Sequence, residues 1–244
     1  MRGRDVPRAG GGGAKRRGWI LHLLMHSELF ITEDGSHSVR VPELNVSYHS
    51  KHGAIQESVH VFMENGLKQI KKRRINILEV GFGTGLNALL TLIEAQKNDL
   101  QILYDVVELH PLDSILVASL NYLSLLGAPH LAEEFSFMHA CEWDVSVKIS
   151  GQFALKKIGR DIRHVELAGK YDLIYFDAFD PSAQPDLWTA DIFKKLSSVS
   201  ADECVLVTYC SKGIVRRAIT EAGFSVLKIP GPTGKREIVR AVKK

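Results

Sequence analysis

Residues 75–87 read INILEVGFGTGLN, and this stretch decides the fold. The apolar run from Ile75 to Val80 is short and ends directly in glycines, which is typical of a buried strand in a parallel sheet. The glycines lead into a helical pattern from Leu86 to Ala95. Glycines let the backbone approach a ligand closely, and a helix N-terminus offers unpaired N–H groups. Because ligands of open parallel sheets bind where the strands end, this loop is a candidate binding site.

Strand and helix patterns alternate on both sides of this stretch. The predicted strands after Val80 cover residues 102–107, 135–138, 171–176 and 204–209. The predicted helices cover residues 54–63, 86–95, 111–126, 186–196 and 214–222. Such alternation predicts an α/β fold with a mostly parallel sheet. The last two strands, Phe224–Ile229 and Glu237–Val242, flank a turn rich in proline and glycine and predict a C-terminal antiparallel hairpin.

The chain of 244 residues suits one domain with additions. Residues 25–244 carry the globular pattern, with a hairpin around Asp34 and Gly35 at its start and an insertion near 145–170, where the alternation stops. Residues 1–24 are basic and rich in glycine, and we expect them to be disordered. Two alternatives stand for this extension. It is a basic arm that binds nucleic acid, or it has no function and translation starts at Met25.

The composition argues against several classes of protein. Hydrophobic residues make up 45% and charged residues 24%, which are ordinary globular values. The longest apolar run, Trp19–Met25, is too short to cross a membrane. Three cysteines without a CxxC pair argue against a disulfide framework or a structural metal and favour the cytoplasm. The formal net charge is +3, but residues 1–18 hold six basic residues against one acidic residue, so only local clusters elsewhere can bind nucleic acid.

The glycine loop fits one kind of cofactor better than others. A dinucleotide-binding loop would carry a third glycine where Leu86 stands, and no Lys-Ser/Thr pair follows as in a phosphate-binding P-loop. The order of Glu79, Gly81, Gly83 and Gly85 resembles the E/D-x-G-x-G-x-G motif of class I S-adenosylmethionine (AdoMet) methyltransferases. The resemblance implies a Rossmann-like fold, and AdoMet as the cofactor of these four residues. A tight turn without a ligand is the alternative.

Two further acidic positions follow strand patterns. Glu108 ends the next strand, 23 residues beyond Gly85, where a carboxylate can accept both ribose hydroxyls of an adenosine. After the strand predicted at 135–138, Glu142 is our choice for the acid that meets the adenine amino group, and Asp144 is the second choice. Either of the latter two can instead cap a helix.

The fourth strand leads into the most specific segments. Residues 177–181 read DAFDP, and residues 185–188 read PDLW. With GAIQES at 53–58, TYCSKG at 208–213 and GKRE at 234–237, they resemble the methyltransferase domain of the MnmC family. That family methylates the amine of 5-aminomethyl(-2-thio)uridine at the wobble position of tRNA. The resemblance spans roughly residue 44 to the C-terminus.

This resemblance implies roles for particular residues. Asp177 is the catalytic aspartate, and Glu57 joins the cofactor site. The implied substrate-binding residues are Phe179, Pro181, Lys212, Arg216, Lys235 and Arg236. The implied partner is the anticodon stem-loop of tRNA, with a functional link to the enzymes that make the aminomethyl precursor. Bifunctional members carry a second, FAD-dependent domain without a counterpart in this sequence, so we expect no FAD and the stand-alone methyltransferase form.

The chemistry assigns Asp177 a mainly electrostatic task. A primary alkylamine has a pKa of about 10.4 and is protonated at neutral pH, whereas an aspartate of pKa about 3.9 is a poor base in water. We therefore expect Asp177 to hold the amine and to stabilise the positive charge that grows on its nitrogen. Phe179 and Trp188 are candidates to stack on the flipped-out uracil. For Trp188 we prefer the alternative, packing of a helix.

Basic clusters and rival functions complete the expectations. Candidate tRNA contacts are Lys71, Lys72, Arg73 and Arg74; Lys212, Arg216 and Arg217; and Lys235 and Arg236. A solvated charged face is the alternative for each cluster. One rival function is an AdoMet methyltransferase or an aminopropyltransferase acting on a small amine. The other rival is a non-catalytic module that binds AdoMet.

Overall fold

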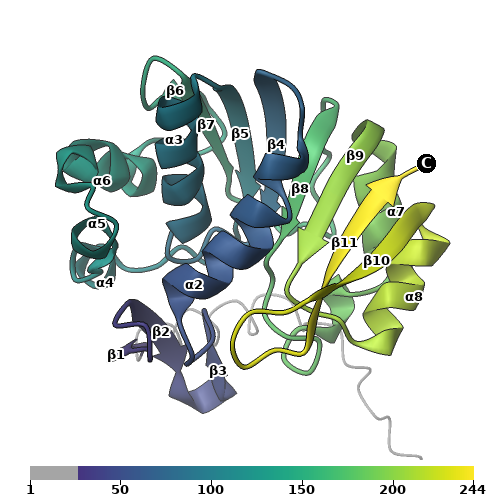
Figure 1. Cartoon of the computed structure of the whole chain (residues 1–244), viewed down its shortest axis with the longest axis horizontal. Helices are drawn as coiled ribbons and strands as arrows, with labels where there is room; N and C mark the ends of the chain where they lie inside the picture. Colours follow the sequence, from purple (N-terminus) through teal and green to yellow (C-terminus); the bar gives the residue numbers. More distant parts are fainter. Residues whose placement is uncertain (1–26) are drawn as a thin grey trace, which may run out of the picture.

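The computed structural model describes residues 27–244, which form a sheet with helices on both faces (Figure 1). The extension predicted for residues 1–24 and the alternative start at Met25 lie outside the described residues. Among residues 27–244, no helix combines the length and the apolar character needed to cross a membrane.

Eight strands form the main sheet. In spatial order they are β10 (Phe224–Pro230), β11 (Glu237–Lys243), β9 (Ser200–Thr208), β8 (Tyr171–Phe176), β4 (Arg74–Val80), β5 (Gln101–Val107), β7 (Phe153–Ile158) and β6 (Ser146–Lys148). The strands from β9 to β7 pair in parallel, whereas β10 with β11, β11 with β9, and β6 with β7 pair antiparallel. The predicted α/β class, the mostly parallel sheet and the C-terminal antiparallel hairpin are confirmed.

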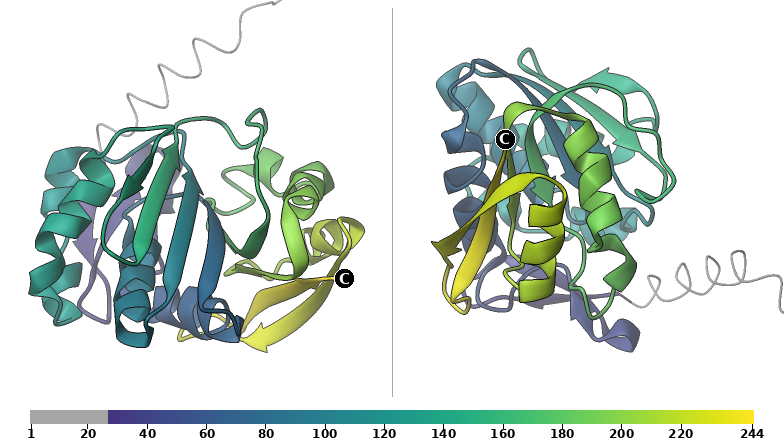
Figure 2. Two further views of the ribbon diagram at one scale, coloured as in Figure 1. Left: turned by 90° about the horizontal axis from the view of Figure 1, so that it is seen from above. Right: turned by 90° about the vertical axis from the view of Figure 1, so that its right-hand side faces the viewer.

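Helices cover both faces of this sheet (Figures 1 and 2). One face carries α2 (Ala54–Ser58), a π-helical turn (Val59–Glu64), α3 (Leu86–Asn98), α4 (Ser114–Ala118), α5 (Tyr122–Leu125) and α6 (Ala132–Ala140). The other face carries α7 (Ala190–Ser198) and α8 (Gly213–Glu221). Each face of the sheet has its own hydrophobic core. Because side chains of a strand alternate, Ile75 and Ile77 of β4 pack into the core under α2 to α6, and Leu78 and Val80 pack into the core under α7 and α8.

A small antiparallel sheet precedes the large one. It contains β1 (Glu28–Ile31), β2 (His37–Val41) and β3 (Val46–Ser47), and β1 and β2 form the predicted hairpin. Gly35 takes a φ of 83° in the turn, a conformation that glycine adopts easily. Short 3-10 turns lie at Pro42–Leu44, Leu67–Gln69, Pro129–Leu131 and Pro185–Leu187.

The strand predicted at 135–138 is wrong, because these residues belong to helix α6. Phe135 and Met138 are its buried residues, and a separation of three places them on one helical face. The third parallel strand is β7, which lies inside the stretch expected as an insertion at 145–170. Lys156 and Lys157 interrupt the apolar pattern of β7, although Lys157 is only 1% exposed, and this interruption hid the strand.

The helix predicted at 111–126 is divided into α4 and α5. The Asp113 side chain caps α4 by accepting a hydrogen bond from the Ile115 N–H. Asn121 lies at the break, where its Oδ1 accepts from the His37 N–H at 2.8 Å and its Nδ2 donates to the Gly35 carbonyl at 2.9 Å. Asn121, placed between the two helices, therefore connects the N-terminal hairpin to the rest of the molecule.

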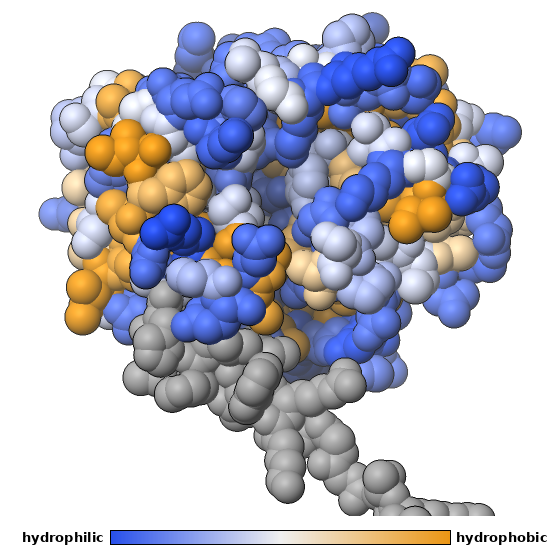
Figure 3. Space-filling view, turned by 90° about the horizontal axis from the view of Figure 1, so that it is seen from below, coloured by the Kyte–Doolittle hydropathy of each residue, from blue (hydrophilic) through white to orange (hydrophobic). Residues whose placement is uncertain are grey.

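The carboxyl ends of the parallel strands lie at the lower side of Figure 1. The N-terminal hairpin lies at the same side, and the β10–β11 turn contacts α2 there. Figure 3 views the molecule from this side, and its surface there is largely hydrophilic around a central hollow. This edge of the sheet collects most of the residues that the sequence singled out.

Candidate active site

The glycine loop connects β4 to α3 as predicted. Gly81, Gly83 and Gly85 have φ values of 95°, 50° and 72°, which side chains other than glycine rarely adopt. The Gly81 N–H donates to the carbonyl of Val107 at the end of β5, at 3.0 Å. A Cβ on Gly81 would lie 2.6 Å from the backbone oxygen of Asp177, so the loop and the end of β8 are in close contact. Gly83 and Gly85 lie equally close to the rings of Tyr48 and His139, so a side chain at any of the three positions would collide with its neighbours.

Glu79 supports this loop from inside. It is 1% exposed, and its two carboxylate oxygens accept hydrogen bonds from Asn87 Nδ2 and from the Tyr104 hydroxyl, each at 2.9 Å. Burial raises the pKa of Glu79 well above its usual value, and nearby Asp177 adds to the shift. Glu79 therefore holds α3 and β5 in place, and its carboxylate oxygens are already engaged.

Glu108 connects the end of β5 to the loop. Its Oε2 accepts from the N–H groups of Phe82 at 3.0 Å and Gly83 at 3.2 Å, and its Oε1 accepts from the His110 N–H at 2.7 Å. Burial raises the pKa of this carboxyl, while the backbone hydrogen bonds oppose the shift. The carboxylate is thus fixed beside the glycines, where the sequence expected a ribose to bind.

The acids expected near an adenine lie differently. Glu142 and Asp144 are both exposed, and Asp144 contacts Arg160 at 3.7 Å. The strand on which Glu142 was chosen is helical, and the third parallel strand ends instead at Ile158. The acid on the loop after β7 is Asp161, and its carboxylate pairs with Arg163. Because the sequence did not predict strand β7, the loop that follows this strand was not considered there.

Asp177 follows β8 directly and faces the loop and α3. Its Oδ2 accepts a hydrogen bond from Asn87 Nδ2 at 2.9 Å. Burial raises the pKa of Asp177 to about 7, and the negative charge of Glu57 adds to the shift, while Asn87 and Lys235 oppose it. The sequence assigned this aspartate its ordinary pKa, because burial is not visible in the local sequence.

Glu57 and Lys235 meet beside Asp177. Glu57 lies on α2, is 6% exposed and accepts a hydrogen bond from the Ser50 N–H at 2.9 Å. Lys235 lies on the β10–β11 turn, forms an ion pair with Glu57 and places its Nζ 3.9 Å from the centre of the Tyr209 ring. The Tyr209 hydroxyl donates to the carbonyl of Ala178 at 2.8 Å. Residues far apart in the sequence thus build one charged cluster.

Aromatic side chains border this cluster. Phe179 forms an edge-to-face pair with Tyr48, with ring centres 4.9 Å apart. Tyr48 also lies over the loop, since a Cβ on Gly83 would be 2.8 Å from its ring. Trp188 is 4% exposed, and its indole N–H donates to the carbonyl of Phe179 at 2.8 Å. Trp188 is therefore a packing residue, the alternative preferred from the sequence, whereas Phe179 is partly exposed.

The remaining residues predicted to bind the substrate differ in their exposure and in the contacts that they already make. Pro181 is buried. Lys212 is ion-paired with Asp180 at 2.6 Å, and the Arg216 Nε donates to the carbonyl of Ser211 at 3.2 Å. Arg236 and Arg217 are exposed, and their guanidinium groups remain candidates for contact with a polyanion.

The basic run from Lys71 to Arg74 lies away from this site. Arg74 begins β4, so the run is at the opposite edge of the sheet from the glycine loop. Lys72 pairs with Asp172 at 2.5 Å, and Arg73 pairs with Asp99. These contacts support the solvated-face alternative for this cluster.

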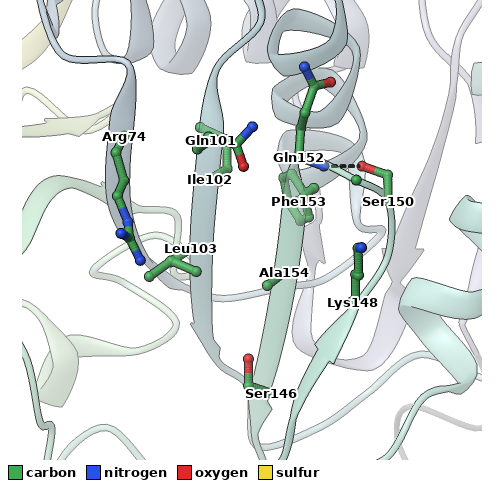
Figure 4. A pocket seen from close by; sticks show the side chains of 11 residues that line it. Arg74, Gln101, Ile102, Leu103, Ser146, Lys148, Ser150, Gln152, Phe153 and Ala154 are labelled. Carbon is green, nitrogen blue, oxygen red and sulfur yellow. Dashed lines mark hydrogen bonds between the residues drawn. The ribbon is translucent and has the colours of Figure 1, made fainter.

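A cavity of about 450 Å³ also lies at the amino ends of the strands (Figure 4). Its lining residues come from the starts of β4 and β5 and from the β6–β7 hairpin, and include Arg74, Leu103 and Lys148. No residue expected in the cofactor site lines it. Among residues 27–244, no cluster of three or more His, Cys, Asp or Glu side chains could hold a metal ion.

Four residues of the site were not found from the sequence: Tyr48, Asn87, Tyr104 and Tyr209. Asn87 follows the glycine motif directly, and Tyr209 stands in the segment TYCSKG at 208–213, so both positions offered a usable signal. Tyr48 follows β3, Tyr104 lies in β5 and Tyr209 follows β9. Only folding brings these three tyrosines close to the acidic residues of the site.

Comparison with known proteins agrees with this fold. A protein family described as S-adenosyl-L-methionine-dependent methyltransferase matches residues 131–244. The bifunctional protein MnmC of tRNA 5-methylaminomethyl-2-thiouridine biosynthesis from Burkholderia multivorans is 30% identical over 238 residues, and its counterpart from Burkholderia thailandensis is 32% identical over 234 residues. The solved structure of MNMC2 from Aquifex aeolicus shares the fold, with a TM-score of 0.71 at 24% identity over 96% of this chain and 78% of that chain.

The two Burkholderia proteins are longer than this chain. The matches cover 88% of this chain but 35% of each relative, so the chain spans about a third of the length of the relatives it matches. The family match at residues 131–244 includes the end of β8 and the C-terminal hairpin, which contribute Asp177 and Lys235 to the charged cluster. The chain is therefore similar to the MnmC proteins over most of its own length, and its residues 131–244 match a family of S-adenosyl-L-methionine-dependent methyltransferases.

Proposed function

We propose that this protein transfers the methyl group of AdoMet to the aminomethyl nitrogen of 5-aminomethyl(-2-thio)uridine at the wobble position of tRNA. One observation carries the proposal: the carboxylate of Asp177, with a pKa raised to about 7, lies beside the glycine loop that is suited to AdoMet. A methyl donor and a group that can handle the proton of an amine are thereby adjacent. The similarity to MnmC supports tRNA as the methyl acceptor.

The cofactor is assigned to the loop side of the cluster. The backbone of Gly81, Gly83 and Gly85 would approach the methionine part, and Glu108 would meet the ribose after exchanging some of its hydrogen bonds to the loop. Glu79 would act through Asn87 and Tyr104, which it holds. The bound AdoMet supplies an activated methyl group, so the protein has to align a nitrogen with it.

Asp177 then has a larger task than the sequence suggested. With a pKa near 7, it can accept the proton that the ammonium group of the substrate must lose, because general bases act best when their pKa lies near the working pH. Once the amine is neutral, its lone pair forms the N–C bond as the S–C bond of AdoMet breaks. After Asp177 has released this proton to solvent, its carboxylate again carries a negative charge and stabilises the positive charge that develops on nitrogen.

The RNA would approach from the hydrophilic edge seen in Figure 3. Phe179, paired with Tyr48, offers an aromatic surface for a flipped-out uracil, as bases of RNA loops are commonly held between aromatic rings. The exposed Arg217 and Arg236 are the best-placed candidates for phosphates of an anticodon stem-loop. The acceptor must come from an enzyme reaction that installs a primary amine on the uridine.

We expect the purified protein to methylate tRNA that carries 5-aminomethyl-2-thiouridine and to leave putrescine unchanged. The measurement is mass spectrometry of nucleosides after incubation with AdoMet, with fully modified tRNA as the control. A product 14 mass units heavier on the wobble nucleoside supports the proposal. Activity on putrescine but not on tRNA would instead establish an enzyme of small amines, and AdoMet binding without any transfer would establish a binding module.

The pH dependence gives a separate prediction. Only the deprotonated carboxylate of Asp177 can accept a proton. The single-turnover rate at a low concentration of substrate should therefore rise with pH, and the plot of rate against pH should level off above a bend near pH 7. Because the charge of Glu57 raises the pKa of Asp177, the Glu57→Gln variant should bend at a lower pH. Glu64→Gln is the matched control, since Glu64 is an exposed partner of Lys68 on the neighbouring π-helical turn. A bend that is the same in all three proteins would remove Asp177 from proton transfer.

A further inference from the structure

The ammonium group of Lys235 is surrounded by groups that recognise cations. It pairs with the Glu57 carboxylate and lies 3.9 Å from the centre of the Tyr209 ring, and Asp177 is within electrostatic reach. A cation over an aromatic face beside carboxylates is the arrangement that proteins use to bind ammonium ligands. The cluster is thus a cage for a primary alkylammonium ion, and a side chain of the protein fills it.

The walls of this cage do not depend on Lys235. Glu57 is held by the Ser50 N–H, Tyr209 by the Ala178 carbonyl, and Asp177 by Asn87. In the same amide, Asn87 Oδ1 is buried and accepts no hydrogen bond from the described residues. A buried acceptor without a donor is costly, so it provides a further place for an N–H group beside Asp177.

The segment that carries Lys235 is held by few contacts. The β10–β11 turn meets α2 and the π-helical turn through Gln56 Nε2 to Thr233 Oγ1 at 3.1 Å, and through His60 Nε2 with the Pro230 carbonyl at 2.8 Å. Both hydrogen bonds are exposed, and exposed polar contacts contribute little net stability. Gly234 also packs closely against the His52 ring, so withdrawal of the turn breaks this contact and the ion pair of Lys235 with Glu57, and the acceptor that enters has to replace them.

We infer that Lys235 is an internal substitute for the amine of the substrate, and that the acceptor amine enters the cage of Glu57, Asp177 and Tyr209 when the β10–β11 turn withdraws Lys235. The inference rests on the proposed amine methylation. Lys235 thereby becomes a residue that determines specificity. A small free amine must compete with a tethered ammonium group of high effective concentration. A large acceptor that also contacts the turn, where Arg236 is exposed, has further binding energy to displace it.

The test removes the internal ammonium group and offers a free one. Lys235→Ala, saturated with S-adenosylhomocysteine so that the cofactor site is filled, is titrated with propylammonium chloride. We expect saturable binding and a melting temperature raised by about 3 °C or more once propylammonium exceeds its dissociation constant tenfold. The wild-type protein should not respond. Lys228→Ala is the matched control, because Lys228 lies on the same hairpin in an exposed ion pair with Glu237.

A neutral probe and two double variants test whether the binding is specific for an ammonium group in the cage. Propan-1-ol has the same shape without the charge and should not stabilise Lys235→Ala. The double variants with Asp177→Asn or Tyr209→Leu should bind propylammonium at least tenfold more weakly than Lys235→Ala. If Lys235→Ala does not fold, Lys235→Met keeps most of the aliphatic stem and leaves room for methylammonium, which is then the probe.

The outcomes separate the two proposals. Equal responses of the wild-type protein and Lys235→Ala, or equal binding by Lys235→Ala and its double variants, would overturn the cage. This experiment needs no RNA, so it can succeed or fail whether or not the wild-type protein methylates tRNA. Absence of methylation by the wild-type protein, with propylammonium still bound by Lys235→Ala, would remove the tRNA substrate but keep a site for an alkylammonium ligand.

Discussion

The Asp177→Asn variant is expected to lower the single-turnover rate of methylation by about a hundredfold or more, which is the usual effect of removing one preorganised electrostatic partner. Asparagine has the same size and can still accept the hydrogen bond from Asn87 Nδ2. It carries no charge and cannot take up a proton near pH 7. Both proposed tasks of the carboxylate, proton acceptance and stabilisation of positive charge, are lost together.

Most of the loss should appear in the chemical step, because an interaction that grows in the transition state affects the rate more than the affinity. The affinity for tRNA should fall only by the part that the contact between its ammonium group and Asp177 supplies, and the affinity for AdoMet should not change. The measurement is single-turnover methylation of tRNA bearing 5-aminomethyluridine at saturating enzyme, with the dissociation constants of AdoMet and tRNA measured in parallel. Asp180→Asn is the matched control, since Asp180 is three residues away and paired with exposed Lys212. A near-wild-type rate for Asp177→Asn would reopen the search to Asp180 and Glu57.

The Gly83→Val variant is expected to abolish AdoMet binding, with an affinity at least a hundredfold weaker. Gly83 has a φ of 50°, and a Cβ at this position would lie 2.8 Å from the Tyr48 ring. Valine is branched at Cβ and tolerates this backbone conformation poorly. It would also fill the space through which the loop backbone approaches the cofactor, and the Gly83 N–H now donates to Glu108.

The affinity for AdoMet is measured by isothermal titration calorimetry on folded protein. Gly127→Ala is the matched control for backbone strain, because Gly127 has a φ of 62° and open space around its Cα. It should lose some stability but keep its affinity. Asp177→Ala should also keep nearly full affinity, since it leaves the loop bare. Equal loss of affinity in Gly83→Val and Asp177→Ala would contradict this division of roles.

Much of the fold was predictable because its signals are local. The apolar run before the glycines, the helix after them and the C-terminal hairpin follow from periodicity and turn residues, and the structure contains them. The third parallel strand was not predictable, because Lys156 and Lys157 break the apolar pattern of β7. Lys157 is buried through contacts with the His139 carbonyl at 2.5 Å and the Trp143 ring at 4.7 Å, both of which lie earlier in the chain.

The sequence by itself determined the α/β class of the protein and the position of its glycine loop. Alternating patterns predict the α/β sheet, and three glycines after an acid at the end of a strand predict where the backbone is open to a ligand. The sequence also places an aspartate at the end of the fourth strand. These features depend on short spacings along one chain segment, which tertiary contacts seldom change.

Only the tertiary structure decided how the site is charged. Glu57, Asp177, Tyr209 and Lys235 come from four separate elements, and their assembly partly buries the aspartate and raises its pKa to about 7. Desolvation and the field of neighbouring charges act through space, so no local pattern reveals them. The same holds for the ammonium group of Lys235, whose place in the cage depends on the β10–β11 turn packing across α2, 177 residues apart at the Gln56–Thr233 contact.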